Sequence, residues 1–545
     1  KISGTRSIIT FDYENGYYDR NAKEFYGFGK VTTKTFIGFD KDDTDKNYPL
    51  YITQSDEYYK DLYYRKGFLK ESDTYGAAEF DKQGYHLSRQ QTEPREIPYA
   101  QPKKEQSWTY EKASGFETAI STATEYDYDK YGNCTDIIQD FGDGQKLTGK
   151  ILYNNDNLNN YAIGLPAHIY VYDTTKHNLL RHREGVYNER GQLTELKQYY
   201  TKDQCSKNLI SYDEYGNIES VTDSRGAKLF YTYDSAVNTF VSGIAQSGKL
   251  TDTYTSVLEY DPITQTKTFE KDCNNNTMQY QYDNWQRIVK IKTDYDPDDT
   301  TAVSYEYYTP AKRNDGSQAL WYAITNNKVK FDTNDDSVIQ TVVQIDGLGR
   351  AIRTAKTGFV NNEDGWNVSG AVEYDEKGRT VKEGMTVFVK WNLEGLLNEP
   401  PEMTKFFTSY TYDDKDRQIK TVLPDGSVQT NDFIIEDNLL VSRATDPLGN
   451  VTVQKTDSRG NIVCVEKEDK TGLSLTKVVY RYNEIGEMLK AVPVPLRNGE
   501  SIKEHPITIE YDMLGRRTAI ESSDSGRQEF FYDACSNLVR ENNSV

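Results

Sequence analysis

Residues 446–465, DPLGNVTVQKTDSRGNIVCV, contain the unit that decides the fold. Residues 446–449 and 457–460 each begin with an aspartate and end with a glycine three residues later. A type I turn favours Asp or Asn at its first position, and a glycine after it can adopt the left-handed backbone that closes a β-hairpin. The β-branched residues Ile462, Val463 and Val465 then continue as a strand. This unit predicts a hairpin of strand, tight turn and strand.

The same pattern recurs along the chain at irregular spacing, as an Asp or Asn, two variable residues and a glycine. The ten copies begin and end at Asp129 and Gly132, Asn188 and Gly191, Asp213 and Gly216, Asp223 and Gly226, Asp346 and Gly349, Asp375 and Gly378, Asp446 and Gly449, Asp457 and Gly460, Asn483 and Gly486, and Asp512 and Gly515. Degenerate copies without the glycine begin at Asp283, Asp413 and Asp533. Each copy predicts a hairpin corner, so these residues form the expected structural turn site.

Aromatic residues alternate on the strands that enter many of these turns. Residues at positions i and i+2 lie on the same face of a strand. The pairs that form a candidate aromatic surface are Tyr231 and Tyr233, Tyr280 and Tyr282, and Tyr410 and Tyr412. Such rows of rings either pack between neighbouring hairpins or form a platform that stacks on sugars. Packing is favoured because the tyrosines follow the turn motif.

Composition excludes several classes of protein. Of the 545 residues, 36% are hydrophobic and 13% are aromatic, which is too aromatic for a disordered chain. The net charge of −20 would repel a nucleic-acid backbone, so no nucleic-acid partner is expected. No apolar run is long enough to predict a membrane span. Because a single hairpin is marginal alone, the units are expected to pair into an all-β, extended, twisting sheet or solenoid.

The turn motifs are unevenly distributed, which suggests two domains. Residues 1–120 contain the fewest, and the prolines Pro94, Pro98 and Pro102 suggest a boundary before the repeats begin. We therefore predict a β-rich region over 1–120 and a repeat sheet over 121–545. Irregular insertions at 308–318, 360–366 and 391–403 are expected to form loops.

No motif predicts catalysis, a cofactor or a metal site. The five cysteines are far apart, and the five histidines, at 86, 168, 177, 182 and 505, have no metal-ligand spacing and are expected at the surface or the edge of the core. The acidic clusters 40–45 and 294–299 could hold calcium, but without a spaced loop motif they favour solvated loops. Residues 25–29, FYGFG, could form a ligand platform, although tight packing is favoured.

The Tyr-Asp-x-x-Gly-Asn/Arg units resemble the YD (Rhs) repeats of Rhs toxins, of insecticidal toxin complexes and of teneurins. Residues 11–31, FDYENGYYDRNAKEFYGFGKV, are similar to a segment in the middle region of the B component of insecticidal toxin complexes. Residues 163–166 (IGLP), 346–350 (DGLGR) and 446–450 (DPLGN) are further matches of this kind. The resemblance covers most of the chain.

This resemblance implies a strip of β-sheet that spirals into a hollow shell around a toxic C-terminal payload. The implied partners are that payload, the remaining shell segments and a pore-forming delivery component, and the implied location is secreted or on a bacterial surface. The family's propeller and self-cleaving aspartyl core are not recognised here, and the chain begins at Lys1, so we expect a non-enzymatic piece of a longer protein. The alternative is an extracellular carbohydrate-binding or adhesion module.

Overall fold

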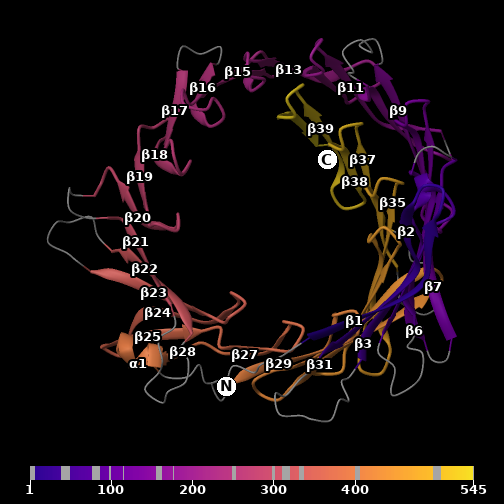
Figure 1. Cartoon of the computed structure of the whole chain (residues 1–545). Helices are drawn as coiled ribbons and strands as arrows, with labels where there is room; N and C mark the ends of the chain where they lie inside the picture. The colour runs from indigo at the N-terminus through magenta and orange to yellow at the C-terminus, as the bar shows by residue number, and fades with distance from the viewer. Residues whose placement is uncertain are drawn as a thin grey trace. The chain divides into compact units, whose positions relative to one another are not determined.

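The computed structural model describes residues 7–37, 50–76, 86–96, 100–113, 116–154, 163–175, 177–247, 253–296, 301–309, 320–329, 337–398, 406–494 and 505–543. Strands and hairpin turns make up nearly all of these residues (Figure 1). The described helices are a single 3-10 turn, η1 (Tyr63–Arg65), and one short α-helix, α1 (Leu393–Asn398). The predicted all-β fold of consecutive antiparallel hairpins is confirmed.

The first sheet has 26 strands. They are β1 (Ser7–Asp19), β2 (Glu24–Ile37), β3 (Leu50–Tyr58), β4 (Leu69–Gly76), β5 (His86–Pro94), β6 (Pro102–Ala113), β7 (Phe116–Tyr128), β8 (Cys134–Asp140), β9 (Lys146–Asn154), β10 (Leu165–Asp173), β11 (Leu179–Tyr187), β12 (Leu193–Tyr199), β13 (Cys205–Tyr212), β14 (Ile218–Thr222), β15 (Lys228–Tyr233), β16 (Val241–Ser247), β17 (Thr253–Tyr260), β18 (Lys267–Lys271), β19 (Thr277–Tyr282), β20 (Ile288–Thr293), β21 (Val303–Tyr308), β22 (Trp321–Lys328), β23 (Val338–Ile345), β24 (Ala351–Val360), β25 (Glu363–Ser369) and β28 (Val387–Val389).

The second sheet has 14 strands. They are β26 (Val372–Tyr374), β27 (Thr380–Gly384), β29 (Phe407–Tyr412), β30 (Gln418–Val422), β31 (Val428–Glu436), β32 (Leu439–Thr445), β33 (Val451–Thr456), β34 (Ile462–Glu468), β35 (Ser474–Tyr482), β36 (Met488–Pro493), β37 (Ile507–Tyr511), β38 (Arg517–Ser522), β39 (Gly526–Tyr532) and β40 (Leu538–Asn543).

Strands pair antiparallel with their neighbours along the chain, so the sheets are meanders of hairpins. In many hairpins the register shifts by one residue at the tyrosine that precedes the turn, as at Tyr128, Tyr282 and Tyr482. A β-bulge at this position increases the local twist and is the expected companion of a turn that closes on a left-handed residue.

The chain divides into two compact units. Residues 208–410 and 422–427 form the central unit, whereas residues 2–207, 411–421 and 428–545 form the terminal unit. Pairing continues through residue 120, because β7 pairs with β6 on one side and β8 on the other. The domain boundary near residue 120 stays a prediction.

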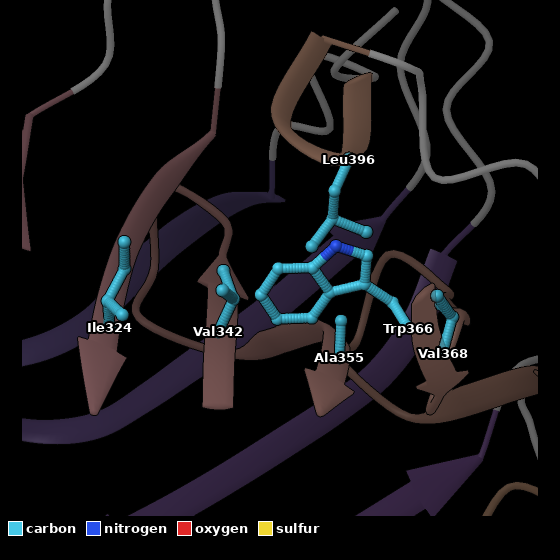
Figure 2. Packing of buried hydrophobic residues seen from close by; sticks show 6 residues of the cluster. All are labelled: Ile324, Val342, Ala355, Trp366, Val368 and Leu396. Carbon is cyan, nitrogen blue, oxygen red and sulfur yellow. The ribbon is translucent and has the colours of Figure 1, made fainter. Parts of the chain in front are cut away.

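An apolar cluster lies in the central unit, where α1 covers one face of β22–β25 (Figure 2). The indole of Trp366 lies between Leu396 of α1 and Ala355 of β24, with Ile324, Val342 and Val368 around it. Trp366 is 4% exposed and Leu396 is fully buried. Excluding these side chains from water is the favourable term that holds the helix on the sheet.

The loop prediction is wrong for two insertions. Residues 391–403 include α1, which forms because Leu393, Leu396 and Leu397 pack on the cluster around Trp366. Residues 360–366 belong to the β24–β25 hairpin, whose turn residues Asn361 and Asn362 have φ of 51° and 67°. Two consecutive left-handed residues are typical of a tight two-residue hairpin turn. The insertion 308–318 lies largely outside the described residues.

The terminal unit contains two layers that are far apart in the sequence. Strand β31 packs against β6 and β7, and the strands that follow β31 lie alongside those that follow β7 (Figure 1). Ile120 of β7 and Val441 of β32 are buried. The face shared by the two layers is therefore the part of this unit in which sequence-distant residues can act together.

Candidate functional site

The aspartate of each Asp-x-x-Gly turn caps the turn with its carboxylate. In the turn at Asp457, the backbone N–H of Asp457 donates to the carbonyl of Asn461 at 2.9 Å, and Gly460 donates back to Asp457 at 3.1 Å. Oδ1 of Asp457 accepts the N–H groups of Arg459 and Asn461 at 3.0 and 2.8 Å. Its Oδ2 accepts the side-chain amide of Asn461 at 3.0 Å. The motif thus satisfies the polar groups that a tight turn would leave unpaired.

The structure places the other predicted turn residues in the same geometry. The N–H of the aspartate donates to the carbonyl of the residue four positions on in the turns that begin at Asp129, Asp213, Asp346, Asp375, Asp446 and Asp512. The glycines have φ between +80° and +96° in Gly132, Gly216, Gly349, Gly378, Gly449, Gly460 and Gly515. Where the glycine is replaced, Gln286, Asp416 and Ser536 adopt φ of 60°, 61° and 68°. The degenerate copies therefore keep the turn with a strained backbone.

Hydrogen bonding favours the charged form of Asp446 and Asp457. The side-chain amide of Asn450 lowers the pKa of Asp446 most. Burial acts to raise this pKa, but the backbone N–H donors also lower it, and the net shift is downward. Burial acts to raise the pKa of Asp457, but donors from Asn461 and Arg459 outweigh it and the net shift is downward. Both carboxylates are therefore charged near neutral pH.

A tyrosine hydroxyl joins each of several hairpins to the preceding one. Tyr233, Tyr482 and Tyr532 donate to the carbonyls of Ile218, Ile462 and Arg517 at 2.8, 2.9 and 2.9 Å. Each acceptor lies five residues after the aspartate of the preceding turn. Tyr153, Tyr307 and Tyr374 follow the same rule. We call these contacts the tyrosine clamp. Sequence reasoning missed the clamp, although the constant offset between an aspartate and the acceptor was a usable signal.

The candidate aromatic surface is packed between strands. Tyr231, Tyr233, Tyr280, Tyr282, Tyr410 and Tyr412 are all half-buried. The hydroxyls of Tyr280 and Tyr410 donate to Glu270 and Glu383 at 3.1 and 3.2 Å, and that of Tyr282 donates to the Lys267 carbonyl at 2.8 Å. Rings with these contacts stabilise the pairing of neighbouring strands, so the carbohydrate-binding alternative is not favoured.

Turn residues of one layer of the terminal unit also bind the other layer. Glu111 of β6, 5% exposed, accepts Nη1 and Nη2 of Arg417 at 2.6 and 2.8 Å and Nζ of Lys415 at 2.7 Å. Lys415 Nζ also donates to the Tyr110 carbonyl, and Arg417 Nε donates to Asp413 at 2.8 Å. A buried carboxylate is thus neutralised by two cations from one turn.

Further contacts of this kind follow along the same two layers. Ser458 donates to the carbonyl of Phe141 at 2.7 Å, and the guanidinium of Arg459 lies 4.8 Å from the centre of the Phe141 ring. Arg181 pairs with Glu487 at 2.5 Å. The N–H of Met513 donates to the Tyr200 carbonyl at 3.2 Å. We call these contacts and the Glu111 cluster the layer seam. Each residue contributed by the C-terminal layer comes from an Asp- or Asn-initiated turn.

Burial sets the electrostatics of the Glu111 cluster. Desolvation lowers the pKa of Lys415, and its bond to Glu111 acts in the opposite sense. Desolvation also acts to lower the pKa of Arg417, but Glu111 and Asp413 outweigh it and the net shift is upward. Glu111, Lys415 and Arg417 border a pocket of about 470 Å³ that Phe433 also lines. The Glu111 cluster is a desolvated ionic contact with open space beside it.

The remaining candidates include histidines that the structure places on the sheet. Groups of three or more metal-ligating side chains are absent from the described ranges. His86 stacks between the rings of Tyr75 and Tyr110, and His182 stacks between Tyr170 and Tyr199. Burial, followed by repulsion from His168, lowers the pKa of His182. These stacks place both histidines at half-buried positions on the sheet, so they serve packing.

The two acidic clusters give no calcium site in the described part of the chain. Residues 40–45 lie outside the described residues, as do 297–299 of the second cluster. Asp294 accepts the N–H of Thr277 at 2.7 Å, and Asp296 accepts those of Thr293 and Ala302 at 2.7 and 3.0 Å. No described helix is long and apolar enough to cross a membrane.

Comparisons with known proteins give one family match and several solved structures of similar fold. Residues 1–65 match the family described as the middle/N-terminal region of the insecticide toxin TcdB. A search of curated proteins gives no match. The chain is similar to the crystal structure of TcdB2–TccC3, with a TM-score of 0.75 and 13% identity over 99% of this chain and 37% of that one.

Two further solved structures have the same fold. One is the Photorhabdus luminescens Tc holotoxin pore with TccC3 mutated, at a TM-score of 0.76 and 13% identity over 100% of this chain and 38% of that one. The other is TcdB2–TccC3–Cdc42, at 0.75 and 13% identity over 99% and 39%. The chain therefore spans less than two fifths of the length of the structures it matches. These findings confirm the resemblance: the chain has the fold of the TcdB2–TccC3 components of Tc toxins, and its first 65 residues match the sequence of a TcdB middle/N-terminal region.

Proposed function

We propose that this chain is a structural wall segment of a Tc-type toxin component, which helps to enclose an effector payload and deliver it. The layer seam is the observation that carries this proposal. A wall made by winding one strip of sheet needs contacts between successive passes of the strip, and such contacts must lie outside the strand ladder. In the terminal unit, the seam joins sequence-distant layers through turn residues such as Lys415, Arg417 and Ser458.

The turn chemistry supports a wall rather than a compact core. Capping aspartates and the tyrosine clamp stabilise each hairpin through polar contacts at the edge of the sheet. Hydrogen-bonded hairpins can then form an extended sheet with only 36% hydrophobic residues. We infer that the chain acts through its shape and not as an enzyme.

The partners and the location are part of the proposal. The matched structures are those of TcdB2 with TccC3 and of a Tc holotoxin pore. By analogy, we propose that this chain acts outside the producing bacterium, with a C-terminal payload, further wall segments and a pore-forming delivery component as partners.

Electron microscopy of the purified 545-residue chain tests the wall proposal. Class averages are expected to show a thin curved wall with solvent on both faces, whereas filled lobes would overturn the wall proposal.

A second measurement tests whether the chain encloses its payload. A flexible reporter with a protease site is fused after Val545 in one variant and before Lys1 in another. Slower cleavage of the C-terminal reporter is expected, and equal cleavage rates would count against enclosure while leaving the wall intact.

A further inference from the structure

The β1–β2 hairpin presents aromatic side chains that none of the described residues cover. Residues 9–18 are exposed without interruption. Ile9, Phe11 and Tyr13 alternate on one face of β1 and are 53%, 52% and 55% exposed. Isolated exposed apolar residues are common on soluble proteins, but a contiguous set marks a surface that binds something.

These rings form one contiguous surface. The ring centres of Tyr13 and Phe28 are 4.7 Å apart, those of Phe25 and Phe28 are 5.2 Å apart, and those of Phe11 and Tyr13 are 6.3 Å apart. Phe25 and Phe28 of β2 are 49% and 38% exposed. We call Phe11, Tyr13, Phe25 and Phe28 the aromatic face. Rings that touch one another while exposed leave a preformed apolar platform without further ordering.

The packing prediction for residues 25–29 is therefore wrong for the two phenylalanines. It holds for their neighbours: Tyr26 is 6% exposed, and a Cβ on Gly29 would lie 2.9 Å from Lys60 Nζ. The register between β1 and β2 shifts at Tyr17 and Tyr18, which leaves Tyr26 outside the pairing, next to Gly27 with φ of 95°. The regular alternation of faces is broken at this bulge, so Tyr26 is covered while the touching rings of Phe25 and Phe28 stay exposed. Both phenylalanines belong to the 65 residues that match the TcdB middle/N-terminal region.

The aromatic face adjoins a free strand edge. β1 pairs with β2 from Ser7 opposite Ile37 to Asp19 opposite Glu24, and within the described residues it pairs with no other strand. A long edge strand presents a row of backbone N–H and C=O groups that can bind another strand. Natural proteins protect such edges with charge, proline or a covering segment, yet the only charges along residues 9–17 are Asp12 and Glu14, on the opposite face.

We propose that β1 and the aromatic face together bind a β-strand from another segment of the toxin assembly, which extends the sheet by strand addition. This inference rests on the proposed wall function. A strand satisfies both features at once, because its backbone pairs with the edge of β1 and its alternate side chains cover the aromatic face. A sugar or a lipid surface would cover the rings and leave the edge unpaired.

The occupant is identified by what the matched structures contain. The chain covers 37–39% of them, so most of each such chain lies outside the part equivalent to this one and can supply the strand. The bound strand should carry apolar side chains at alternate positions toward the aromatic face. On its other face it should carry neutral or basic side chains, which suit Asp12 and Glu14.

A strand peptide tests the proposal with the full 545-residue chain. The probe is a capped, fluorescently labelled Lys-Thr-Val-Thr-Val-Thr-Val-Thr-Lys peptide, and the control peptide has the same composition with its valines adjacent. We expect saturable binding of the first peptide, measured by fluorescence anisotropy, together with slower amide exchange across β1. Binding of both peptides with equal affinity would overturn the proposal, because it would show apolar adsorption rather than strand pairing.

Matched variants locate the site. Phe11→Ser with Tyr13→Ser is expected to weaken peptide binding about tenfold or more, since exposed aromatic anchors dominate such interfaces. Tyr63→Ser with Tyr64→Ser removes two equally exposed rings of η1 and should leave binding unchanged. Unchanged binding in the first variant would refute the proposal. So would self-association of the chain through the aromatic face, seen by sedimentation, because a second copy would then be the occupant. Electron microscopy reports on the wall independently of either result.

Discussion

The central and terminal units stabilise the same hairpins in different ways. In the central unit, β22–β25 are covered by α1, and Trp366 lies in an apolar cluster with Leu396 (Figure 2). In the terminal unit, the described turns at Asp446, Asp457, Asp512 and Asp533 are capped by their carboxylates, and the layers meet in ionic and hydrogen-bonded contacts such as that of Glu111. The sheet geometry therefore does not require one kind of core. Capped turns and the tyrosine clamp occur in both units, and the units differ in what covers their hairpins.

The largest difference between the units is expected from Trp366→Ala. Removing the indole leaves a cavity under α1, so we expect a loss of about 3–5 kcal/mol in unfolding free energy, confined to the central unit. Hydrogen exchange by mass spectrometry during urea unfolding checks this. β22–β25 should lose protection while β32–β36 keep theirs. Equal loss in both units would show that they unfold together.

Glu111→Gln should have the next largest effect, in the terminal unit. The substitution leaves the half-buried Lys415 without its anionic partner and Arg417 with Asp413 alone, and we expect a loss of about 3 kcal/mol. Glu57→Gln is the matched control, because Glu57 pairs with Lys70 on the surface and should contribute less than about 1 kcal/mol. Urea denaturation of both variants separates a desolvated ion cluster from an exposed pair. Similar losses would contradict the seam.

Asp457→Ala tests the capped turn itself. Removing the carboxylate leaves the N–H groups of Arg459 and Asn461 without their acceptor in a turn where Asp457 is 5% exposed, so we expect a loss of about 2 kcal/mol. Asp457→Asn keeps the acceptor oxygen and should recover about half of that loss. If both variants unfold like the wild type, the cap does not stabilise the hairpin.

Tyr482→Phe measures one contact of the tyrosine clamp. It removes the hydrogen bond to the Ile462 carbonyl and keeps the ring, so we expect a loss of about 1 kcal/mol. Tyr480→Phe is the control on the same strand, since the hydroxyl of Tyr480 makes no hydrogen bond in the described structure, and it should be neutral. Thermal unfolding of the pair gives the difference directly.

Gln286→Gly should produce the smallest change, and with the opposite sign. Gln286 adopts φ of 60° at the position where most turns have glycine, so glycine should relieve strain and stabilise the hairpin by about 0.5–1 kcal/mol. Gly460→Ala places a side chain at φ of +87° and should destabilise by a similar amount. A destabilising Gln286→Gly would mean that the side chain itself contributes to the turn.

The sequence predicts the turns, which nearby residues form, but not the contacts between residues that are far apart in the chain. The Asp-x-x-Gly pattern places the turns because both residues act within five positions of each other. Helix α1 escaped prediction because six residues give too short an apolar period, and tertiary contacts stabilise it, namely the packing on Trp366 and the bond from Arg353 to the Leu396 carbonyl. The seam escaped because Glu111 and Lys415 carry no shared periodicity. The exposure of Phe25 and Phe28 depends on which neighbours are present, which composition does not reveal.

The spacing of the contacts also sets an order of folding. Each clamp joins residues about 15 to 23 positions apart, such as Tyr532 with Arg517 and Tyr374 with Ala351. Such short loops close early, so hairpins can be added one after another as the chain leaves the ribosome. Glu111 and Lys415 are 304 residues apart and cannot meet until the intervening sheet exists. Each seam contact therefore forms only after the hairpins that lie between its two residues, and a chain stalled before it would expose the unpaired layer to aggregation.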